Sequence, residues 1–198
     1  MNDRGPFSLL FALIAALALG ACQAEAGPPP LQGARMGGDF TLTDQNGRRV
    51  SSDQFAGKYR IVYFGYTFCP DVCPVDLQLI SGALRQFEER DPERAEKVVP
   101  IFITTDPRRD TPEVLAQFAR SFHPRLVALT GSPEEIGHVA RDFGVYFEAR
   151  EPSPGTTEYL VDHNRIAVLY GPQGDPIAIV PHDQGPGGVL ETLERWVQ

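Results

Sequence analysis

Cysteine, positive charge and long hydrophobic runs are all scarce in this sequence of 198 residues, and each shortage excludes something. Three cysteines are too few for a structural zinc site built from two cysteine pairs. Acidic residues outnumber basic ones by 26 to 18, and the net charge of −8 argues against nucleic acid and anionic lipid head groups as partners. No repeat at solenoid or propeller spacing is present. The remaining composition, 42% hydrophobic and 22% charged, is that of one globular domain with some extra tail.

The N-terminal apolar stretch predicts a removable signal peptide. It runs from Phe7 to Leu19, interrupted only by Ser8, and at 13 residues it is too short to span a bilayer. The letters LGAC that end at Cys22 resemble the lipobox of bacterial lipoproteins. We therefore expect residues 1–21 to be removed and a lipid to be attached to Cys22. Ordinary signal cleavage, with Cys22 incidental, is the alternative.

A flexible tether is expected from residue 22 to residue 38. This stretch is rich in Ala, Gly and Pro and includes three consecutive prolines, so it has little to bury. A lipid on Cys22 would anchor the folded domain, residues 39–198, at the periplasmic side of a bacterial membrane. That extracytoplasmic compartment is oxidising, so the other two cysteines would be oxidised unless a reductant or a metal prevents it.

Strand and helix patterns alternate along residues 39–198 and predict an α/β domain. An Asn-Gly turn at 46–47 predicts an N-terminal β-hairpin, and the apolar run 61–64 predicts a central strand covered on both faces. Further strands and capped helices follow, and the segments 166–170 and 177–180 predict a late hairpin before a last helix. This order is that of the thioredoxin-like fold, a mixed central sheet flanked by helices.

The other two cysteines lie four positions apart in YTFCPDVCP, each followed by proline. A helix that begins near Asp71 would place Cys69 and Cys73 on one face, at the carboxyl end of the sheet, where ligands of α/β domains bind. The helix N-terminus favours thiolates while Asp71 opposes them, so we expect no extreme thiol pKa. We also expect aromatic side chains to limit the access of water to the pair, namely Tyr63, Phe64, Tyr66 and Phe68.

The spacing leaves three uses open for this pair: a stabilising disulfide, a redox-active dithiol, or two ligands of a metal. Dithiol oxidoreductases of the thioredoxin type have two residues between the cysteines, whereas this loop has three. The wider loop can still form a disulfide, but it suits two sulfurs that bind one ion at least as well. Thiolates prefer Cu(I), or zinc where four ligands close the site.

A metal site would need a third ligand, and four histidines are available. His138 lies on the polar side of its predicted helix and is expected to be solvated, and His123 is expected to be a helix-end residue. His182 follows a strand in a polar loop and stays open as a ligand. His163 lies in YLVDHNR, in a loop that a thioredoxin-like sheet places near the cysteine helix, so we favour it over His182.

Four segments of the chain resemble the Sco/SenC family, whose members help to assemble cytochrome c oxidase. They are GYTFCPDVCP, TTDPRRDTPEVL, SFHPRLVALTG and YLVDHNR, and the similarity covers everything after the N-terminal tail. The resemblance implies a thioredoxin-like domain that binds copper through Cys69, Cys73 and His163. It also makes Asp71 and Asp162 candidates for orienting the loop or the imidazole. The acidic segment DPRRD is expected to be only a helix-capping loop.

A membrane-tethered copper chaperone is therefore the first hypothesis. Two thiolates and one imidazole would bind Cu(I), and the imidazole would also support Cu(II). The resemblance implies that the recipient is the dinuclear copper centre in the copper-receiving subunit of cytochrome c oxidase. A thioredoxin-like reductant or another copper chaperone is a further partner compatible with this role.

A thiol-disulfide reductase is the alternative hypothesis. Here Cys69 and Cys73 would form a redox-active pair that keeps the oxidase subunit's cysteines reduced. The two roles can coexist, so the sequence leaves open whether the protein is also an enzyme. A module that senses copper or redox state stays open too, whereas a second cysteine so close is atypical of a peroxidase.

Overall fold

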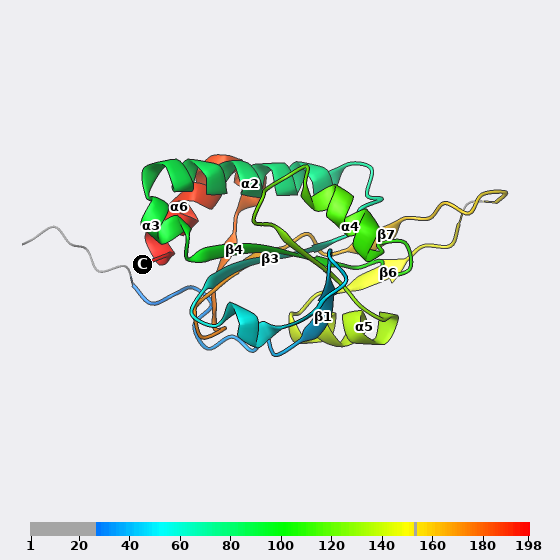
Figure 1. Ribbon diagram of the computed structural model, residues 1–198, viewed down its shortest axis with the longest axis horizontal. Coiled ribbons are helices and arrows are strands. Elements are labelled where there is room, and N and C mark those ends of the chain that lie inside the picture. Colours follow the sequence, from blue (N-terminus) through cyan, green and yellow to red (C-terminus); the bar gives the residue numbers. More distant parts are fainter. Residues whose placement is uncertain (1–26, 153) are drawn as a thin grey trace, which may run out of the picture.

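The computed structural model describes residues 27–152 and 154–198 (Figure 1). The predicted signal peptide and the predicted lipid attachment at Cys22 lie outside these residues. The strands are β1 Thr41–Asp44, β2 Arg49–Ser51, β3 Tyr59–Gly65, β4 Val98–Thr104, β5 Val127–Thr130, β6 Phe147–Ala149, β7 Val161–His163, β8 Ala167–Tyr170 and β9 Pro176–Val180. The helices are α2 Val72–Arg90, α3 Pro92–Ala95, α4 Pro112–Ala119, α5 Pro133–Asp142 and α6 Pro186–Trp196, with short 3-10 helices η1 Ser52–Phe55 and η2 His182–Gln184.

Seven strands form one mixed sheet in the order β2-β1-β5-β4-β3-β8-β9. The central strands β3, β4 and β5 are parallel to one another. Antiparallel strands flank them, with the β1–β2 hairpin on one side and the β8–β9 hairpin on the other. The prediction of a thioredoxin-like α/β fold with an N-terminal hairpin and a late hairpin is confirmed.

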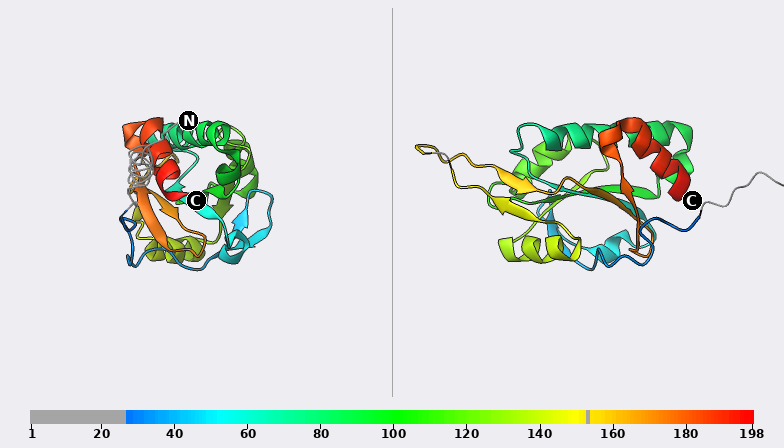
Figure 2. Two further views of the ribbon diagram at one scale, coloured as in Figure 1. Left: turned by 90° about the vertical axis from the view of Figure 1, so that its left-hand side faces the viewer. Right: turned by 180° about the vertical axis from the view of Figure 1, so that it is seen from behind.

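The sheet separates two hydrophobic cores because its central strands are buried on both faces. All seven residues of β3 are buried, as the apolar run in the sequence predicts. Side chains alternate along the strand, so Ile61 packs in the core that α2, α4 and α6 cover, while Val62 packs in the core that α5 covers. The views in Figures 1 and 2 show α2 and α6 on one side of the sheet and α5 on the other.

The helix starts follow the capping signals in the sequence. The side chain of Thr111 accepts a hydrogen bond from the Val114 N–H at the start of α4. Ser132 and Glu135 form the predicted capping box at the start of α5. Such caps typically contribute about 1 kcal/mol each, which explains why these boundaries can be read from sequence.

Part of the predicted tether lies against the domain. The N–H of Leu31 donates to the Ile177 carbonyl at 3.0 Å, and the N–H of Gly37 donates to the Asp142 carbonyl at 2.8 Å. The side chain of Leu31 also packs against the core covered by α5. Among the described residues, no helix combines the length and the apolar character needed to cross a bilayer.

A separate two-stranded ribbon, formed by β6 and β7, is absent from the sequence-based prediction. Its antiparallel register pairs Phe147 with His163. His163 therefore ends a strand, whereas the sequence suggests that it lies in a loop. Strands of three residues are too short to leave a recognisable alternation of polar and apolar residues. The chain between the two strands extends away from the body of the domain (Figure 1).

Candidate metal centre

The cysteine loop connects the end of β3 to the start of α2. The helix begins at Val72 with Asp71 as its N-cap residue, as predicted. Cys73 lies in the first turn and is fully buried, whereas Cys69 lies in the loop and is 9% exposed. Gly65 ends β3 directly beneath the helix tip, and a Cβ atom there would lie only 3.0 Å from Cys73 Sγ. The absence of a side chain at Gly65 thus makes room for the sulfur.

The structure brings His163 to the two cysteines, although 90 positions separate it from Cys73. His163 Nε2 lies 3.4 Å from Cys73 Sγ, and the Cys73 N–H donates to Cys69 Sγ at 3.5 Å. His163 Nδ1 lies 3.2 Å from the Asn164 carbonyl oxygen, which can only accept a hydrogen bond. Nδ1 must therefore carry the ring proton in the neutral imidazole, and the lone pair of Nε2 faces the sulfur.

All three side chains have the chemistry of ligands for a soft ion, and Cys73 and His163 also have the spacing. Ligand bonds of about 2.3 Å for sulfur and 2.0 Å for nitrogen place the two atoms roughly 3.4 to 3.8 Å apart, which matches the separation of Cys73 Sγ and His163 Nε2. No group of three or more His, Cys, Asp and Glu side chains in the described part of the chain is already arranged as a complete ion-binding cluster. Binding an ion through all three side chains therefore requires some rearrangement of them.

Cys69 is much the more acidic of the two thiols. A hydrogen bond from the Cys73 thiol lowers the pKa of Cys69 to about 5, with help from the N–H groups of Cys73, Asp71 and Val72 and against the effect of burial. The same hydrogen bond, together with burial, raises the pKa of Cys73. The expectation of no extreme pKa is therefore wrong. Asp71 acts on the thiolate through its backbone N–H, while its carboxylate lies at the surface.

We expect Cys69 in the reduced protein to react with iodoacetamide well below the pH at which an ordinary thiol reacts. The alkylation rate measured against pH should have its midpoint near pH 5. In Cys73→Ala, which removes the main hydrogen-bond donor, the midpoint should move up toward the ordinary value of 9.0. A midpoint near the ordinary value in both proteins would contradict the assignment.

The same pKa shift makes stability depend on pH. Because the pKa of Cys69 is lower in the folded than in the unfolded chain, its contribution to stability is complete above the unfolded value. That contribution is lost as the pH falls through the folded value of about 5.

Tyr63 and Tyr66 enclose the ligands as predicted. Tyr63 is 1% exposed and lies within hydrogen-bond reach of Cys73. Burial raises the pKa of Tyr63, so its hydroxyl stays protonated. The ring of Tyr66 meets the ring of His163 edge to face, with centroids 6.1 Å apart. These contacts shield Cys73 and one face of the imidazole from water.

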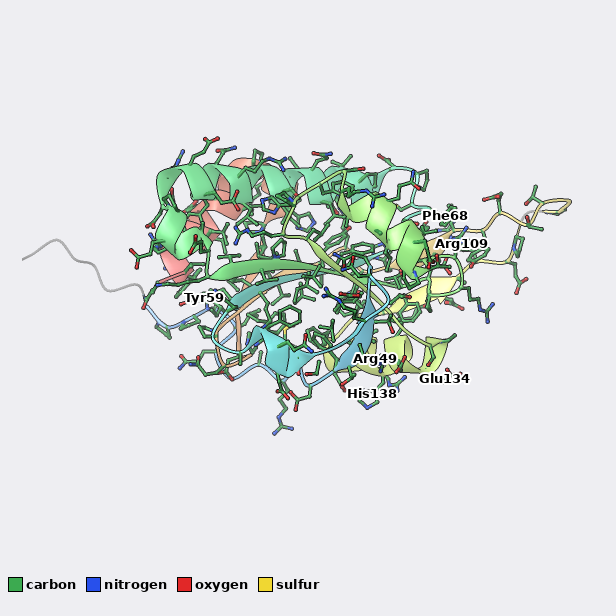
Figure 3. The ribbon with its side chains drawn as sticks, in the orientation of Figure 1. Arg49, Tyr59, Phe68, Arg109, Glu134 and His138 are labelled. Carbon is green, nitrogen blue, oxygen red and sulfur yellow. The ribbon has the colours of Figure 1, made fainter. Side chains whose placement is uncertain are left out.

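Phe64 and Phe68 do not shield the cysteines, which corrects the prediction for both. Phe64 follows Tyr63 on β3 and so points to the opposite face of the sheet, where its ring lies 5.7 Å from that of Phe143. Phe68 is 47% exposed. Its ring lies 4.9 Å from the Arg109 guanidinium, at the outer edge of the site (Figure 3).

Asp76 is a fully buried carboxylate one helical turn after Cys73, and sequence reasoning missed it. Arg165 donates hydrogen bonds to both of its oxygens, and the Tyr63 hydroxyl donates to one of them at 2.8 Å. Because Arg165 follows His163 by two residues, this ion pair attaches the His163 segment to α2. Its spacing of three residues from Cys73 and four from Ile80 places Asp76 on the inward face of α2, and this spacing is visible in the sequence.

His182, left open as a ligand by the sequence, belongs to this buried cluster. Its Nδ1 lies 3.0 Å from the Val180 carbonyl, and its ring packs edge to face on Tyr63 with centroids 5.8 Å apart. Its Nε2 is 3.3 Å from an Asp76 oxygen but lacks the alignment of a hydrogen bond. His182 therefore packs behind the site, whereas His163 reaches the sulfur.

The segment DPRRD does more than cap a helix. Asp110 is fully buried, and it accepts hydrogen bonds from the Thr67 N–H at 3.0 Å, from the Thr67 hydroxyl at 2.6 Å and from the Thr104 hydroxyl. Burial raises the pKa of Asp110. Because Thr67 lies two residues before Cys69, this carboxylate holds the cysteine loop against the end of β4.

Asp71 and Asp162, the candidates for orienting the loop or the imidazole, are both exposed. Asp162 forms two hydrogen bonds with Arg150, at 2.6 and 2.7 Å, and these lower the pKa of Asp162. Asp71 lies beside Cys69 at the rim of the site. The recorded hydrogen-bonding neighbours of the imidazole are Cys73 and Asn164. A supporting role for Asp71 and Asp162 stays a prediction.

The other two histidines lie away from the cysteines. His138 is exposed, as predicted, and pairs with Asp142 at 3.0 Å (Figure 3). His123, expected at a helix end, is only 2% exposed, and its Nδ1 accepts a hydrogen bond from the Arg125 N–H at 3.2 Å. Burial lowers the pKa of His123.

A shallow cavity of about 220 Å³ opens beside the ligands. Cys69 and His163 line it, whereas the fully buried Cys73 does not. Two exposed apolar side chains, Val72 and Leu160, also line it. A second molecule can therefore approach Cys69 and the imidazole directly, and it reaches Cys73 only after them.

Known proteins resemble this chain in sequence over most of its length. Protein sco1 of Schizosaccharomyces pombe is 40% identical over 164 residues, which are 82% of this chain and 60% of that protein. Protein SCO1 homolog 1, mitochondrial, of Arabidopsis thaliana is 41% identical over 140 residues, 71% of this chain and 40% of that protein. The chain thus spans about half the length of these curated relatives.

A solved structure has the same fold. Bradyrhizobium japonicum ScoI with copper bound superposes with a TM-score of 0.73 at 37% identity, covering 81% of this chain and 99% of that one. The family model described as SCO1/SenC matches residues 28–198, which include the cysteine loop, the His163 ribbon and the Asp76 cluster. This match covers most of the sequence, and the chain belongs to the SCO1/SenC family.

Proposed function

We propose that this protein is a copper chaperone that binds copper through Cys69, Cys73 and His163. The observation that carries the proposal is the 3.4 Å approach of His163 Nε2 to Cys73 Sγ beside a second cysteine. The copper-bound structure of the related ScoI supports copper as the ion. Two thiolates favour Cu(I), and the imidazole adds a ligand that Cu(II) also accepts.

The site is built to load copper with the loss of one proton. Cys69 is already a thiolate near neutral pH, because the pKa of Cys69 is lowered to about 5. Cys73 keeps its proton, which must leave when its sulfur binds the ion. A copper ion held by three ligands would then face the cavity beside Cys69, where ligands of an acceptor protein can replace them one by one.

The acceptor in this proposal is the copper-receiving subunit of cytochrome c oxidase. The chain belongs to the SCO1/SenC family. Its resemblance to Sco/SenC proteins, which help to assemble cytochrome c oxidase, supports this choice of acceptor. A lipid on Cys22 would anchor the domain at the periplasmic side of a bacterial membrane and keep it beside membrane-bound acceptors.

A thiol-disulfide reductase is the second candidate, and the unequal thiols favour it. The Cys69 thiolate would attack a disulfide of the acceptor, forming a mixed disulfide and releasing one acceptor thiolate. Cys73, after losing its proton, would attack Cys69 Sγ and release the second acceptor thiolate. The acceptor gains two electrons, and Cys69 and Cys73 end as a disulfide. A thioredoxin-like dithiol would then reduce that disulfide.

Replacing His163 with alanine should separate the two functions. We expect reduced His163→Ala to retain less than one copper per chain after desalting, while wild type retains one Cu(I) and no zinc. The rate of reduction of a disulfide substrate should change little, because thiol exchange uses only the two cysteines. Metal analysis and a thiol-release assay on the same samples provide both readouts.

The matched control for this test is His138→Ala, which removes an exposed histidine distant from the cysteines. It should match wild type in both assays. Full copper retention by His163→Ala would remove the imidazole from the site and overturn the proposed ligand set. Parallel loss of copper and of reductase activity would instead show that His163 also serves the thiol chemistry.

A further inference from the structure

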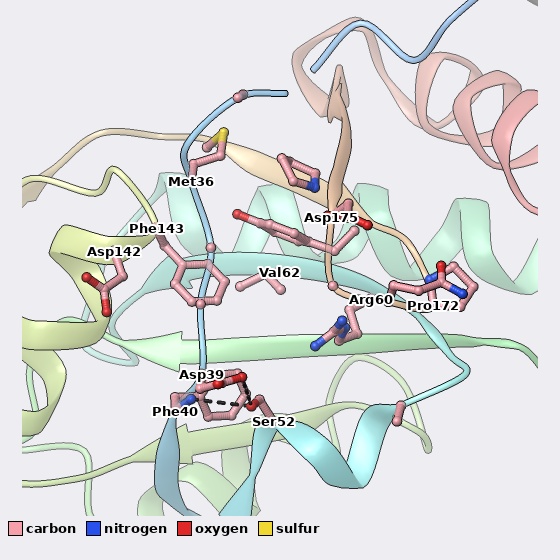
Figure 4. A pocket seen from close by; sticks show the side chains of 18 of the residues that line it. Met36, Asp39, Phe40, Ser52, Arg60, Val62, Asp142, Phe143, Pro172 and Asp175 are labelled. Carbon is pink, nitrogen blue, oxygen red and sulfur yellow. Dashed lines mark hydrogen bonds between the residues drawn. The ribbon is translucent and has the colours of Figure 1, made fainter. Parts of the chain in front are cut away.

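A second and larger cavity lies at the other end of β3, and the proposed copper function does not use it. Its volume is about 920 Å³, and residues 34–40, η1, the start of β3, the end of α5 and the β8–β9 turn line it. Figure 4 shows Arg60 extending into this space between Asp39 on one side and Asp175 on the other. Arg60 lies five residues before Gly65, so about 17 Å of strand separates this cavity from the cysteines.

Arg60 is a buried charge without a counter-charge. The residue is only 8% exposed, and none of the ion pairs in the described part of the chain includes it. One nitrogen donates to the Gly171 carbonyl at 3.3 Å, while Nε has no partner in the structure. Gly174, at a φ of +95°, lets the turn approach closely, because a Cβ there would lie 2.9 Å from the guanidinium. The turn thus holds the guanidinium in place without neutralising it.

Burying such a group is costly unless something pairs with it. An ion taken out of water loses several kcal/mol of solvation, which only an opposite charge with good hydrogen bonds recovers. Burial accordingly lowers the pKa of Arg60, and the charges of Asp39 and Asp175 oppose that effect only from a distance. Arg60 is therefore buried without contact to a carboxylate of the described residues. A negatively charged ligand would supply the missing counter-charge.

The walls of the cavity are apolar on the side that leads to Arg60. They are formed by Phe40, Val62, Phe143 and Tyr170, all less than 9% exposed. The volume lies in the range of small-molecule sites, about 300 to 1,000 Å³. A guanidinium can bind a planar carboxylate through two parallel hydrogen bonds. Beside an apolar wall, it therefore suits a ligand whose carboxylate is attached to an apolar group.

The other charged side chains around the cavity favour a ligand with a single negative charge. Four carboxylates line the cavity, namely Asp39, Asp53, Asp142 and Asp175. Against them stand only two further arginines, Arg35 and Arg141, both exposed. A phosphate-like dianion would gain from Arg60 but would be repelled by this acidic rim.

We propose that this cavity binds a small monocarboxylate with an apolar body, held by Arg60. Such a carboxylate is found on a free aliphatic or aromatic acid and at the C-terminus of a peptide. The site is independent of the copper ligands, so its failure would leave the proposed function untouched.

Binding can be tested with phenylacetate as the probe. In NMR titrations, phenylacetate should shift the amide resonances of Gly171, Gly174 and Ser52, whereas neutral phenylacetamide should not. Arg60→Met should weaken phenylacetate binding at least about tenfold, the effect of losing a charge-assisted hydrogen-bonded pair. Arg60→Lys keeps the charge but not the planar guanidinium. Its affinity for phenylacetate should lie between those of wild type and Arg60→Met.

The matched control is Arg35→Met, which removes an exposed arginine from the same lining and should bind phenylacetate as wild type does. Equal binding of acid and amide, or equal binding by Arg60→Met and wild type, would overturn the proposal. Because a buried unpaired charge is removed, Arg60→Met is expected to fold, and Arg60→Lys provides the test if it does not.

Two further probes examine the charge limit and the source of the carboxylate. Benzylphosphonate as a dianion should bind more weakly than phenylacetate to wild type, and Asp175→Asn should narrow that difference. Tighter dianion binding by wild type would contradict the role of the acidic rim. Acetyl-Gly-Phe with a free carboxylate, compared with its amide, tests the peptide source. Tighter binding than phenylacetate indicates a peptide C-terminus, and weaker binding indicates a free acid.

Discussion

Replacing Cys73 with serine is expected to weaken Cu(I) binding more than a hundredfold. Loss of residues that merely support a metal ligand typically costs 10- to 100-fold in affinity, so loss of a thiolate ligand should cost more. Cys73 Sγ also lies 3.4 Å from His163 Nε2, and a serine oxygen is a poor ligand for a soft ion. Competition with a Cu(I) chelator of known affinity, on reduced protein, measures the effect.

The control for Cys73→Ser is Ala83→Ser, because Ala83 is also fully buried on α2 but lies nearly three turns further along. It tests whether a new buried hydroxyl in this helix disturbs copper binding by itself, and it should leave the affinity unchanged. Copper held by Cys73→Ser as tightly as by wild type would refute the proposed site. Equal weakening in both variants would assign the effect to helix damage.

Replacing Asp76 with asparagine should both destabilise the domain and loosen the metal site. Asp76 is fully buried and accepts hydrogen bonds from Arg165 and Tyr63. Removing one partner of a hydrogen-bonded charge pair typically costs about 1–3 kcal/mol of unfolding free energy, and because the Arg165 side chain is 39% exposed, water can partly solvate its guanidinium after the change. Because Arg165 attaches the His163 segment to α2, we also expect copper affinity to fall about tenfold. Urea unfolding and chelator competition measure the two effects separately.

Glu88→Gln is the matched control for this second prediction. Glu88 also lies on α2 and pairs with Arg125, away from the cysteines. It should lose stability without losing copper affinity. Adding Arg165→Met to Asp76→Asn should recover part of the stability, since the unpaired charge is gone, but none of the affinity. Wild-type copper affinity in Asp76→Asn would show that the ion pair stabilises the fold without positioning His163.

The parts of the site that could be predicted from sequence are those set by local rules. A cysteine pair four residues apart, with proline at the start of a helix, fixes the placement of Cys69 and Cys73 within a few residues. Likewise, Thr111 and Ser132 mark helix starts through side-chain caps that need no distant contact. The prediction for Phe64 is wrong because side chains alternate along β3, so a residue next to Tyr63 in sequence lies on the opposite face of the sheet.

The parts that could not be predicted depend on contacts between distant segments. Nothing local to His163 indicates that it reaches Cys73, and pattern alone favoured it over His182 only weakly. The partners of Asp76 and Asp110 cannot be predicted from the sequence, because the residues that bury and bind these carboxylates lie on other elements. The low pKa of Cys69 likewise depends on its hydrogen bond to Cys73, which requires the folded loop.

Both described ends of the chain leave the domain at the end opposite the cysteines. Residue 27 and the C-terminus lie together beyond the far end of α2 in Figures 1 and 2, while the ribbon that carries His163 lies at the other end. The 19 residues of α2 extend for about 28 Å between them at 1.5 Å per residue. Coupling the protein by its C-terminus to a sensor chip or a bead would therefore direct Cys69 and Cys73 away from the support, toward the solution that flows past.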